Sequence, residues 1–172
     1  MKILVMGFTK LKYMPYMNFY LENIGCETNE VHLLYWNRDG KEEIALPFPV
    51  SLHEFHYLQE DDVPKYQKLG GFVKYRSFAL ELLKAQKFDF IVVLHSLPGV
   101  LVSGYLTRHY RNRFILDYRD FTYENLSFFK KTVHKLVNAS YATFVSSNAF
   151  RSILPPACLL YTSFCSSSSK TV

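Results

Sequence analysis

Hydrophobic residues recur along the chain in two alternating patterns, short apolar runs and longer stretches with helical spacing. The apolar runs predict β-strands at residues 2–7, 30–36, 88–95, 113–120 and 141–147, with weaker candidates at 50–58 and 157–164. Helical spacing predicts helices at residues 15–24, 72–86, 96–110 and 125–139. In the first of these helices, one apolar stripe is formed by Met17, Tyr20, Leu21 and Ile24.

Local signals sharpen the ends of these elements. Pro15 suits the first position of a helix and Gly25 suits its C-terminal cap, whereas the two glycines within 69–72 favour a loop before the next helix. Parallel neighbouring strands need a crossover connection, so strands that alternate with helices predict a parallel sheet. The fold class expected is α/β, a three-layer, Rossmann-like domain with a mostly parallel sheet.

Composition limits the class of protein. The chain has 172 residues, of which 49% are hydrophobic, and this is enough for one core. Three scattered cysteines predict neither a disulfide framework nor a zinc site and fit a reducing cytoplasm. No run reaches the roughly 18 apolar residues of a membrane span. The formal net charge of +5 comes from dispersed lysines and arginines, which favours an anionic partner but not nucleic acid.

Polar residues that could carry chemistry follow three of the predicted strands. In parallel α/β sheets, ligands bind outside the carboxyl ends of the strands, so these residues are expected to share one edge. The three groups are Gly7 with Thr9 and Lys10, His95 with Ser96, and Asp117 with Arg119 and Asp120.

Structural interpretations of the same residues stay open. His95 could cap the following helix, and the Asp117 group could be a local ion pair with an N-cap for the helix after it. The acidic residues within 59–65 lie in a proline-bounded polar loop, which favours a solvated turn over a metal site.

Several well-known motifs are absent from the sequence. There is no Gly-x-Gly-x-x-Gly after the first strand, no phosphate-binding loop and no Gly-x-Ser-x-Gly elbow. The first strand also lacks the acidic residues that a receiver domain carries at its end. Dinucleotide-dependent dehydrogenases, α/β-hydrolases and response regulators are therefore disfavoured.

Four segments together resemble a known family: "MKILVMGFTK", "VVLHSLPGVLVSGYLTRHY", "FILDYRD" and "LVNASYATFVSSNAFRSIL". In order and placement they are similar to the N-terminal domain of a GT-B glycosyltransferase, most closely the family 4 enzymes of bacterial polysaccharide assembly. The resemblance covers residues 1–154. It implies one half of a GT-B fold, in which this domain binds the acceptor and a separate C-terminal domain binds the nucleotide-sugar.

The resemblance also implies roles for the residues at the strand ends. His95 would face the transferred sugar, and Asp117, Arg119 and Asp120 would lie beside the acceptor pocket. Residues 7–13 would approach the donor phosphates. The catalytic candidates are then His95 and Asp120, and the substrate-binding candidates are Gly7, Thr9, Lys10, Ser96, Asp117 and Arg119. No metal is required, and no cofactor is expected in this chain beyond the nucleotide-sugar of the complete enzyme.

The C-terminal segment departs from the family. Residues 155–172 form a serine-rich segment, which we expect to be a truncated or aberrant tail in place of the C-terminal donor domain. The expected function is the acceptor-binding half of a glycosyltransferase, inactive alone, with a donor domain or subunit and a glycan or lipid-linked acceptor as partners. The expected location is cytoplasmic, with peripheral contact at the inner face of the membrane. The alternative is a non-catalytic α/β module that binds a small ligand or partner.

Overall fold

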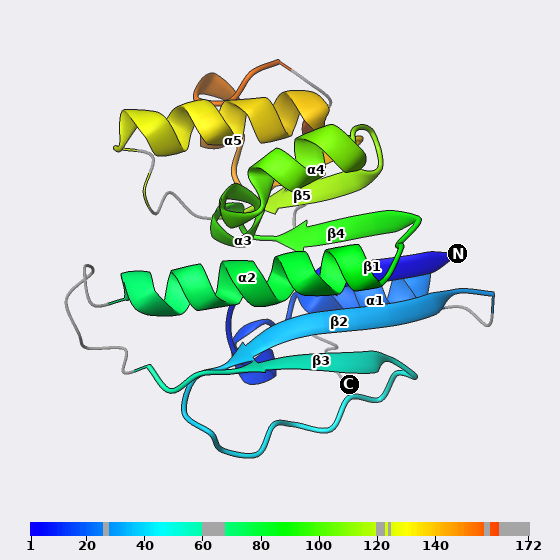
Figure 1. The fold of residues 1–172 in the computed structure, drawn as a ribbon. Helices are drawn as coiled ribbons and strands as arrows, with labels where there is room; N and C mark the ends of the chain where they lie inside the picture. The colour runs from blue at the N-terminus through cyan, green and yellow to red at the C-terminus, as the bar shows by residue number, and fades with distance from the viewer. Residues whose placement is uncertain (26–27, 60–67, 120–122, 124, 157–158, 162–172) are drawn as a thin grey trace, which may run out of the picture.

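The computed structural model describes residues 1–25, 28–59, 68–119, 123, 125–156 and 159–161, and shows a seven-stranded sheet in which all strand pairs are parallel. The sheet order is β3-β2-β1-β4-β5-β6-β7. Its strands are β1 (Lys2–Met6), β2 (Glu30–Asn37), β3 (Ser51–His56), β4 (Phe90–Leu94), β5 (Phe114–Tyr118), β6 (Ala142–Val145) and β7 (Leu159–Tyr161). The predicted α/β class and parallel sheet are confirmed (Figure 1).

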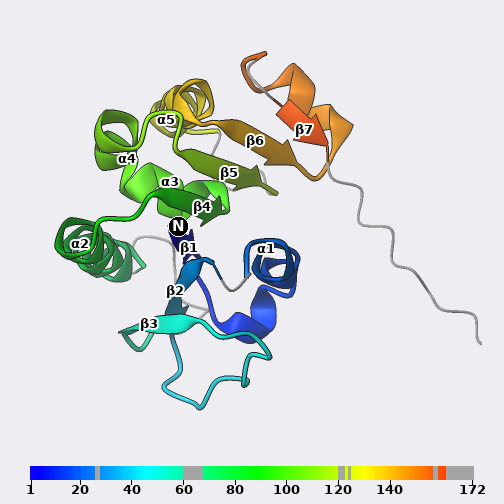
Figure 2. The ribbon, with the colours of Figure 1, turned by 90° about the vertical axis from the view of Figure 1, so that its right-hand side faces the viewer.

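Helices cover both faces of this sheet and make three layers (Figure 2). One face carries α2 (Leu69–Ala85), α3 (Ser96–Leu101), α4 (Ser103–His109) and α5 (Ser127–Ala139). The other carries α1 (Met17–Ile24) and the short 3-10 helix η1 (Leu11–Tyr13), while a second 3-10 helix, η2 (Asn148–Ser152), follows β6. Among the described helices, none combines the length and the apolar character needed to cross a lipid bilayer.

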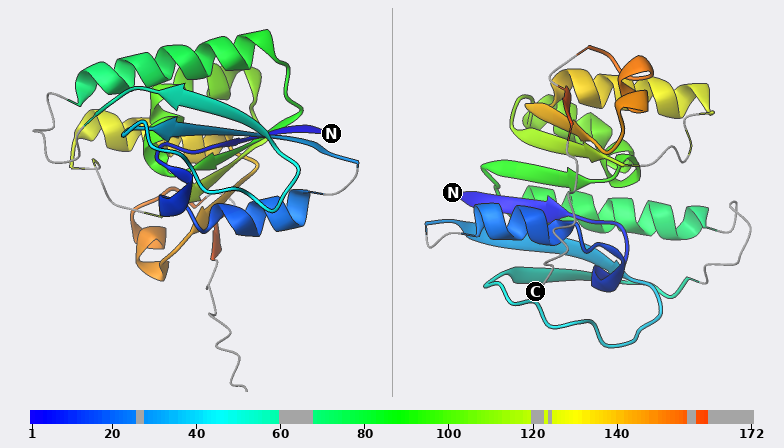
Figure 3. Two further views of the ribbon diagram at one scale, coloured as in Figure 1. Left: turned by 90° about the horizontal axis from the view of Figure 1, so that it is seen from below. Right: turned by 180° about the vertical axis from the view of Figure 1, so that it is seen from behind.

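Each sheet face has its own core because side chains alternate along the central strands. In β1, Leu4 and Met6 pack into the core under α2–α5, whereas Val5 packs into the core under α1. β4 alternates in the same way, with Val93 on the first side and Val92 on the second. The two cores therefore share the same strands, which Figure 3 shows lying between the two helical layers.

Three helix boundaries differ from the sequence prediction. α1 begins at Met17, so Pro15 precedes the helix instead of opening it. The predicted helix at 96–110 is two helices, because Val102 adopts φ −111° and ψ 16° while its side chain is almost completely buried. The glycines expected in a loop belong to α2. Position 71, in the first turn of α2, requires glycine because the Trp36 ring lies where a β-carbon would be.

Candidate functional site at the carboxyl edge of the sheet

The carboxyl ends of all strands meet at one edge of the sheet because every strand runs in the same direction. In Figure 1 the arrowheads of β4 and β5 point to this edge, from which α2 and α5 begin. Segments that follow β1, β2, β4 and β5 therefore converge there, and two hollows open between them.

The first hollow, which we call the His95 hollow, has a volume of about 240 Å³. Its described lining residues come from the loops after β1, β2 and β4, the start of α2, and the segment before α5. They are Phe8, Thr9, Arg38, Lys68, Phe72, His95, Ser96, Leu97 and Tyr123. This set contains two cations and a histidine but no carboxylate, so it favours an anionic or hydroxyl-rich ligand.

Arg38 and Lys68 are the cations of this hollow, and neither was among the sequence candidates. Arg38 follows β2 directly, and its Nη2 donates a hydrogen bond to the Phe8 carbonyl at 2.9 Å. Its guanidinium also lies 4.4 Å from the centre of the Trp36 ring. These contacts fix a cation between the loops after β1 and β2. The available signal is a cation close after an apolar run, but Arg38 stands among the turn-forming residues Asn37, Asp39 and Gly40, which indicate only a turn.

The second hollow lies beside the first and shares Thr9 and Arg38 with it. Its volume is about 440 Å³. Lys10 also lines it, but the Lys10 ammonium is paired with Asp39 at 2.5 Å and lies 3.5 Å from Glu43. The hydrogen bond to Asp39 raises the pKa of Lys10, and Glu43 adds to the effect. Lys10 therefore lines this hollow with its charge compensated by two carboxylates.

His95 has a strained backbone at the point where β4 turns into α3. Its φ is 77° and its ψ is 158°, a region that is almost confined to glycine. Its N–H donates to the Asp117 carbonyl at 3.0 Å, which holds the turn against β5. The side chain makes no capping hydrogen bond to α3, so capping does not explain the histidine. Ser96 is buried directly after it.

A partly buried ion pair is linked to the His95 ring through Tyr16. The Arg119 Nε donates to Asp117 Oδ2 at 2.8 Å, and the Arg119 guanidinium lies 4.0 Å from the centre of the Tyr16 ring. The Tyr16 ring in turn contacts the His95 ring edge-on, with centroids 5.4 Å apart. A continuous set of contacts thus links the end of β5, through α1's start, to the wall of the His95 hollow.

Asp117 is unusual for a carboxylate because it is only 1% exposed. Burial raises the pKa of Asp117, although the Arg119 guanidinium opposes this change. Burial and the nearby Asp117 likewise raise the pKa of the Tyr20 phenol. Asp117 Oδ1 accepts no hydrogen bond from any described residue. Asp117 thus lies in the core, where Arg119 Nε donates a hydrogen bond to its carboxylate.

Gly7 allows close packing of the loop after β1. Its carbonyl accepts a hydrogen bond from the buried Tyr75 hydroxyl at 2.5 Å, and its N–H donates to the Leu34 carbonyl at 2.8 Å. A β-carbon there would lie 2.5 Å from the Met14 sulfur. Gly7 therefore lets the loop after β1 pass close to Met14 and brings Thr9 to both hollows.

The remaining candidates have mixed outcomes. Asp120 lies outside the described residues. The ion pair expected of its group is present between Asp117 and Arg119, but the expected N-cap is wrong, because Leu126 occupies that position of α5 and makes no side-chain cap. Within the described part of the chain, no three His, Cys, Asp or Glu side chains gather closely enough to hold a metal ion.

Comparisons with known proteins identify the fold. No family model and no curated protein matches the sequence. Sucrose-phosphate synthase from Thermosynechococcus elongatus matches in structure with a TM-score of 0.59 and 10% identity, over 92% of this chain and 87% of that chain. Another structure of that enzyme matches with a TM-score of 0.61 and 9% identity, over 93% of this chain and 47% of that chain. This chain therefore spans less than half the length of the latter chain.

Sucrose-phosphate synthase is a glycosyltransferase of the GT-B type. The chain thus has the fold of a glycosyltransferase domain.

Proposed function

We propose that this chain is the acceptor-binding half of a glycosyltransferase that transfers a sugar from a nucleotide-sugar to a glycan or lipid-linked acceptor in polysaccharide biosynthesis. The observation that carries the proposal is the His95 hollow, which combines a strained histidine with two cations at the carboxyl edge of a glycosyltransferase-like domain. The sequence resemblance to family 4 supports the same assignment. Donor binding and the completion of the site fall to a separate domain or subunit.

The chemistry of glycosyl transfer matches the residues of this hollow. The reaction passes through an oxocarbenium-like state and releases a nucleotide diphosphate, so it needs oriented polar groups at the sugar and positive charge near the leaving group. His95 would hydrogen-bond a sugar hydroxyl, with Thr9 and Ser96 beside it. Arg38 would bind an anionic group of the acceptor or donor.

In this scheme Asp117 and Arg119 do not contact the substrate but act through the His95 ring. Asp117 pairs with Arg119, and Arg119 contacts the Tyr16 ring that packs against His95, so we assign both residues the positioning of the His95 ring. The acceptor hydroxyl requires a proton acceptor during transfer. From the resemblance alone, Asp120 is proposed for that role.

The intrinsic fluorescence of Trp36 tests acceptor binding directly. Trp36 is the only tryptophan in the chain and lies beneath the Arg38 guanidinium, so a ligand in the His95 hollow should change its emission. We expect a saturable change with lipid-linked or free glycan acceptors, weakened about tenfold or more in His95→Gln and Arg38→Gln. The matched controls are His56→Gln on the exposed edge strand β3 and Arg151→Gln in η2.

Turnover assays separate a half-enzyme from the alternatives. The chain alone, given nucleotide-sugars and a bound acceptor, should release no nucleotide above the blank. Adding a cognate donor-binding domain, fused or separate, should then give transfer. Steady turnover by the chain alone would contradict the half-enzyme proposal. Acceptor binding that never leads to transfer would instead favour a non-catalytic binding module, and a failure to bind any acceptor would remove the acceptor role.

A further inference from the structure

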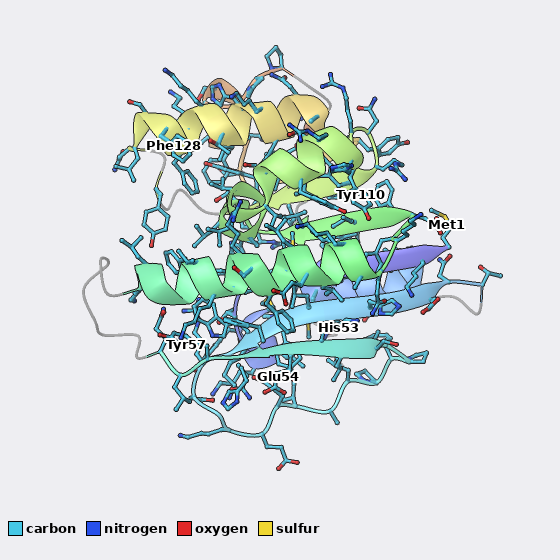
Figure 4. All side chains as sticks on the ribbon, viewed as in Figure 1. Met1, His53, Glu54, Tyr57, Tyr110 and Phe128 are labelled. Atoms are coloured by element: carbon cyan, nitrogen blue, oxygen red, sulfur yellow. The ribbon has the colours of Figure 1, made fainter. Side chains whose placement is uncertain are left out.

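A groove of about 260 Å³ lies between α2 and α4, away from the hollows described above. It shares no lining residue with them. Its cations are Arg76, Lys84, Arg108 and His109 when protonated, and the described lining residues include no carboxylate. Both helices lie on the same face of the sheet (Figure 1). In Figure 4, Tyr110, which directly follows α4, marks the end of the molecule opposite Phe128 and the strand carboxyl edge.

The positions of these cations follow from the periodicity of the two helices. Arg76 and Lys84 are eight residues apart on α2, which places them on one face with Leu80 between them. Arg108 and His109 stand three and four residues after Tyr105 on α4. The groove is therefore lined by one stripe from each helix, and the stripes carry charge of the same sign.

Helix-end electrostatics explain only part of this arrangement. A cation in the last turn of a helix is favourable, and this accounts for Lys84 on α2 and for Arg108 and His109 on α4. Arg76 stands in the middle of α2, where that effect has faded. Its Nε donates to the Leu101 carbonyl at 3.0 Å, where α3 ends, and this bond fixes the guanidinium at the groove.

The charges of the groove lack compensation from the described part of the chain. No described carboxylate pairs with Arg76, Lys84, Arg108 or His109. Like charges gathered this way repel one another, and the lining between them is apolar at Leu80, Leu101 and Val102. A bound anion would relieve the repulsion.

We infer that the α2–α4 groove binds a phosphate-bearing anion at a site separate from the His95 hollow. A single carboxylate would leave most of the charge uncompensated, whereas a diphosphate matches three or four cations. Two arginines also favour phosphate, because a guanidinium can donate two parallel hydrogen bonds to it. Gly104 lines the groove with nothing within 4 Å of the position of a β-carbon, which leaves room for the ligand.

Inorganic pyrophosphate is the probe, with binding to the full chain measured by calorimetry and by amide NMR shifts. We expect saturable binding that shifts the Gly104 amide, and at least tenfold weaker binding in the double variant Lys84→Gln/Arg108→Gln. Neither substituted side chain makes a hydrogen bond or ion pair to a described residue, so folding should be unaffected. Gly104→Glu should also abolish binding, whereas Arg151→Gln should bind pyrophosphate as the unmodified chain does.

Vesicles of anionic phospholipid distinguish the source of the phosphate. If the unmodified chain binds these vesicles and the Lys84→Gln/Arg108→Gln variant does not, the ligand is a lipid headgroup. If the chain binds pyrophosphate but not the vesicles, the ligand is a soluble phosphate compound. The inference is overturned if neither pyrophosphate nor vesicles bind. It is equally overturned if Arg151→Gln weakens binding as much as the groove variants do.

Discussion

At the carboxyl edge of the sheet, the sequence predicts which residues are polar candidates but not their backbone strain or their contacts. His95, Asp117 and Arg119 could be marked from the sequence because polar side chains follow apolar runs there. The strain at His95 could not be predicted, since it arises from β4 passing into α3 without a loop. The contact between Tyr16 and Arg119 also depends on how α1 and β5 meet in space.

Substitutions at His95 should reveal the strained backbone. His95→Gly and His95→Ala both remove the ring, but only glycine adopts a φ of 77° without steric cost. The strain is about 1 to 3 kcal/mol, and glycine's greater freedom in the unfolded chain offsets about 0.5 to 1 kcal/mol of it. We therefore expect His95→Gly to be more stable than His95→Ala by about 1 kcal/mol in urea unfolding. Equal stability, or a more stable alanine variant, would show that this backbone is not strained.

The buried carboxyl of Asp117 should make stability depend on pH. Its pKa is raised above 3.8 in the folded chain, so the folded state holds this proton more tightly than the unfolded state. The resulting stabilisation is complete below the unfolded pKa and is lost as pH rises through the folded pKa. Asp117→Asn cannot ionise and should lose this dependence.

Urea unfolding at a series of pH values from below 3.8 to neutral checks the Asp117 prediction. The free energy of unfolding of the unmodified chain, minus that of Asp117→Asn, should fall as pH rises. Asp89→Asn, at an exposed carboxylate, controls for the change in net charge. A difference that stays constant or grows with pH would mean that the Arg119 ion pair outweighs burial.

At the scale of elements, burial decides which parts of the fold could be predicted. β1 and β4 are buried on both faces and give uninterrupted apolar runs, so their positions were clear. β3 lies at the sheet edge with Phe55 as its only buried residue, and its pattern was correspondingly weak. The break between α3 and α4 was missed because Val102 continues the apolar stretch while its backbone leaves the helix.

The two glycines that open α2 should respond in opposite ways to substitution. A β-carbon at Gly71 would overlap the Gln59 amide oxygen and lie 2.6 Å from the Trp36 ring, whereas one at Gly70 would have its nearest neighbour at 3.8 Å. Trp36 is completely buried and has little room to move. Gly71→Ala should therefore destabilise the chain by about 1 to 3 kcal/mol.

Gly70→Ala is the matched control and should stabilise the chain by about 0.5 to 1 kcal/mol through helix propensity. Thermal and urea unfolding of both variants measure the difference. If both alanines stabilise the chain, then Trp36 can shift and α2 does not depend on this close approach.

Across the whole molecule, one sheet serves two cores, and this should make folding cooperative. Alternate side chains of β1, β2 and β4 enter opposite cores, so loss of either core removes packing from strands that the other needs. Binary patterning indicated the buried strands, but not which helices cover each face. That assignment depends on crossover connections that only the assembled sheet shows (Figure 2).

A destabilising substitution in α1 should therefore also lower the stability of the core on the opposite face of the sheet. Leu21 is completely buried in the α1-side core, whereas Trp36, the only tryptophan, belongs to the core under α2–α5. Leu21→Ala should lower the free energy of unfolding by about 2 to 5 kcal/mol. Trp36 fluorescence and far-UV circular dichroism should report the same shifted urea transition. Leu52→Ala, at a half-exposed position of β3, should change it much less. If Leu21→Ala instead gives an early dichroism change while the Trp36 transition stays in place, then the α1 side unfolds separately and the shared strands do not couple the two cores.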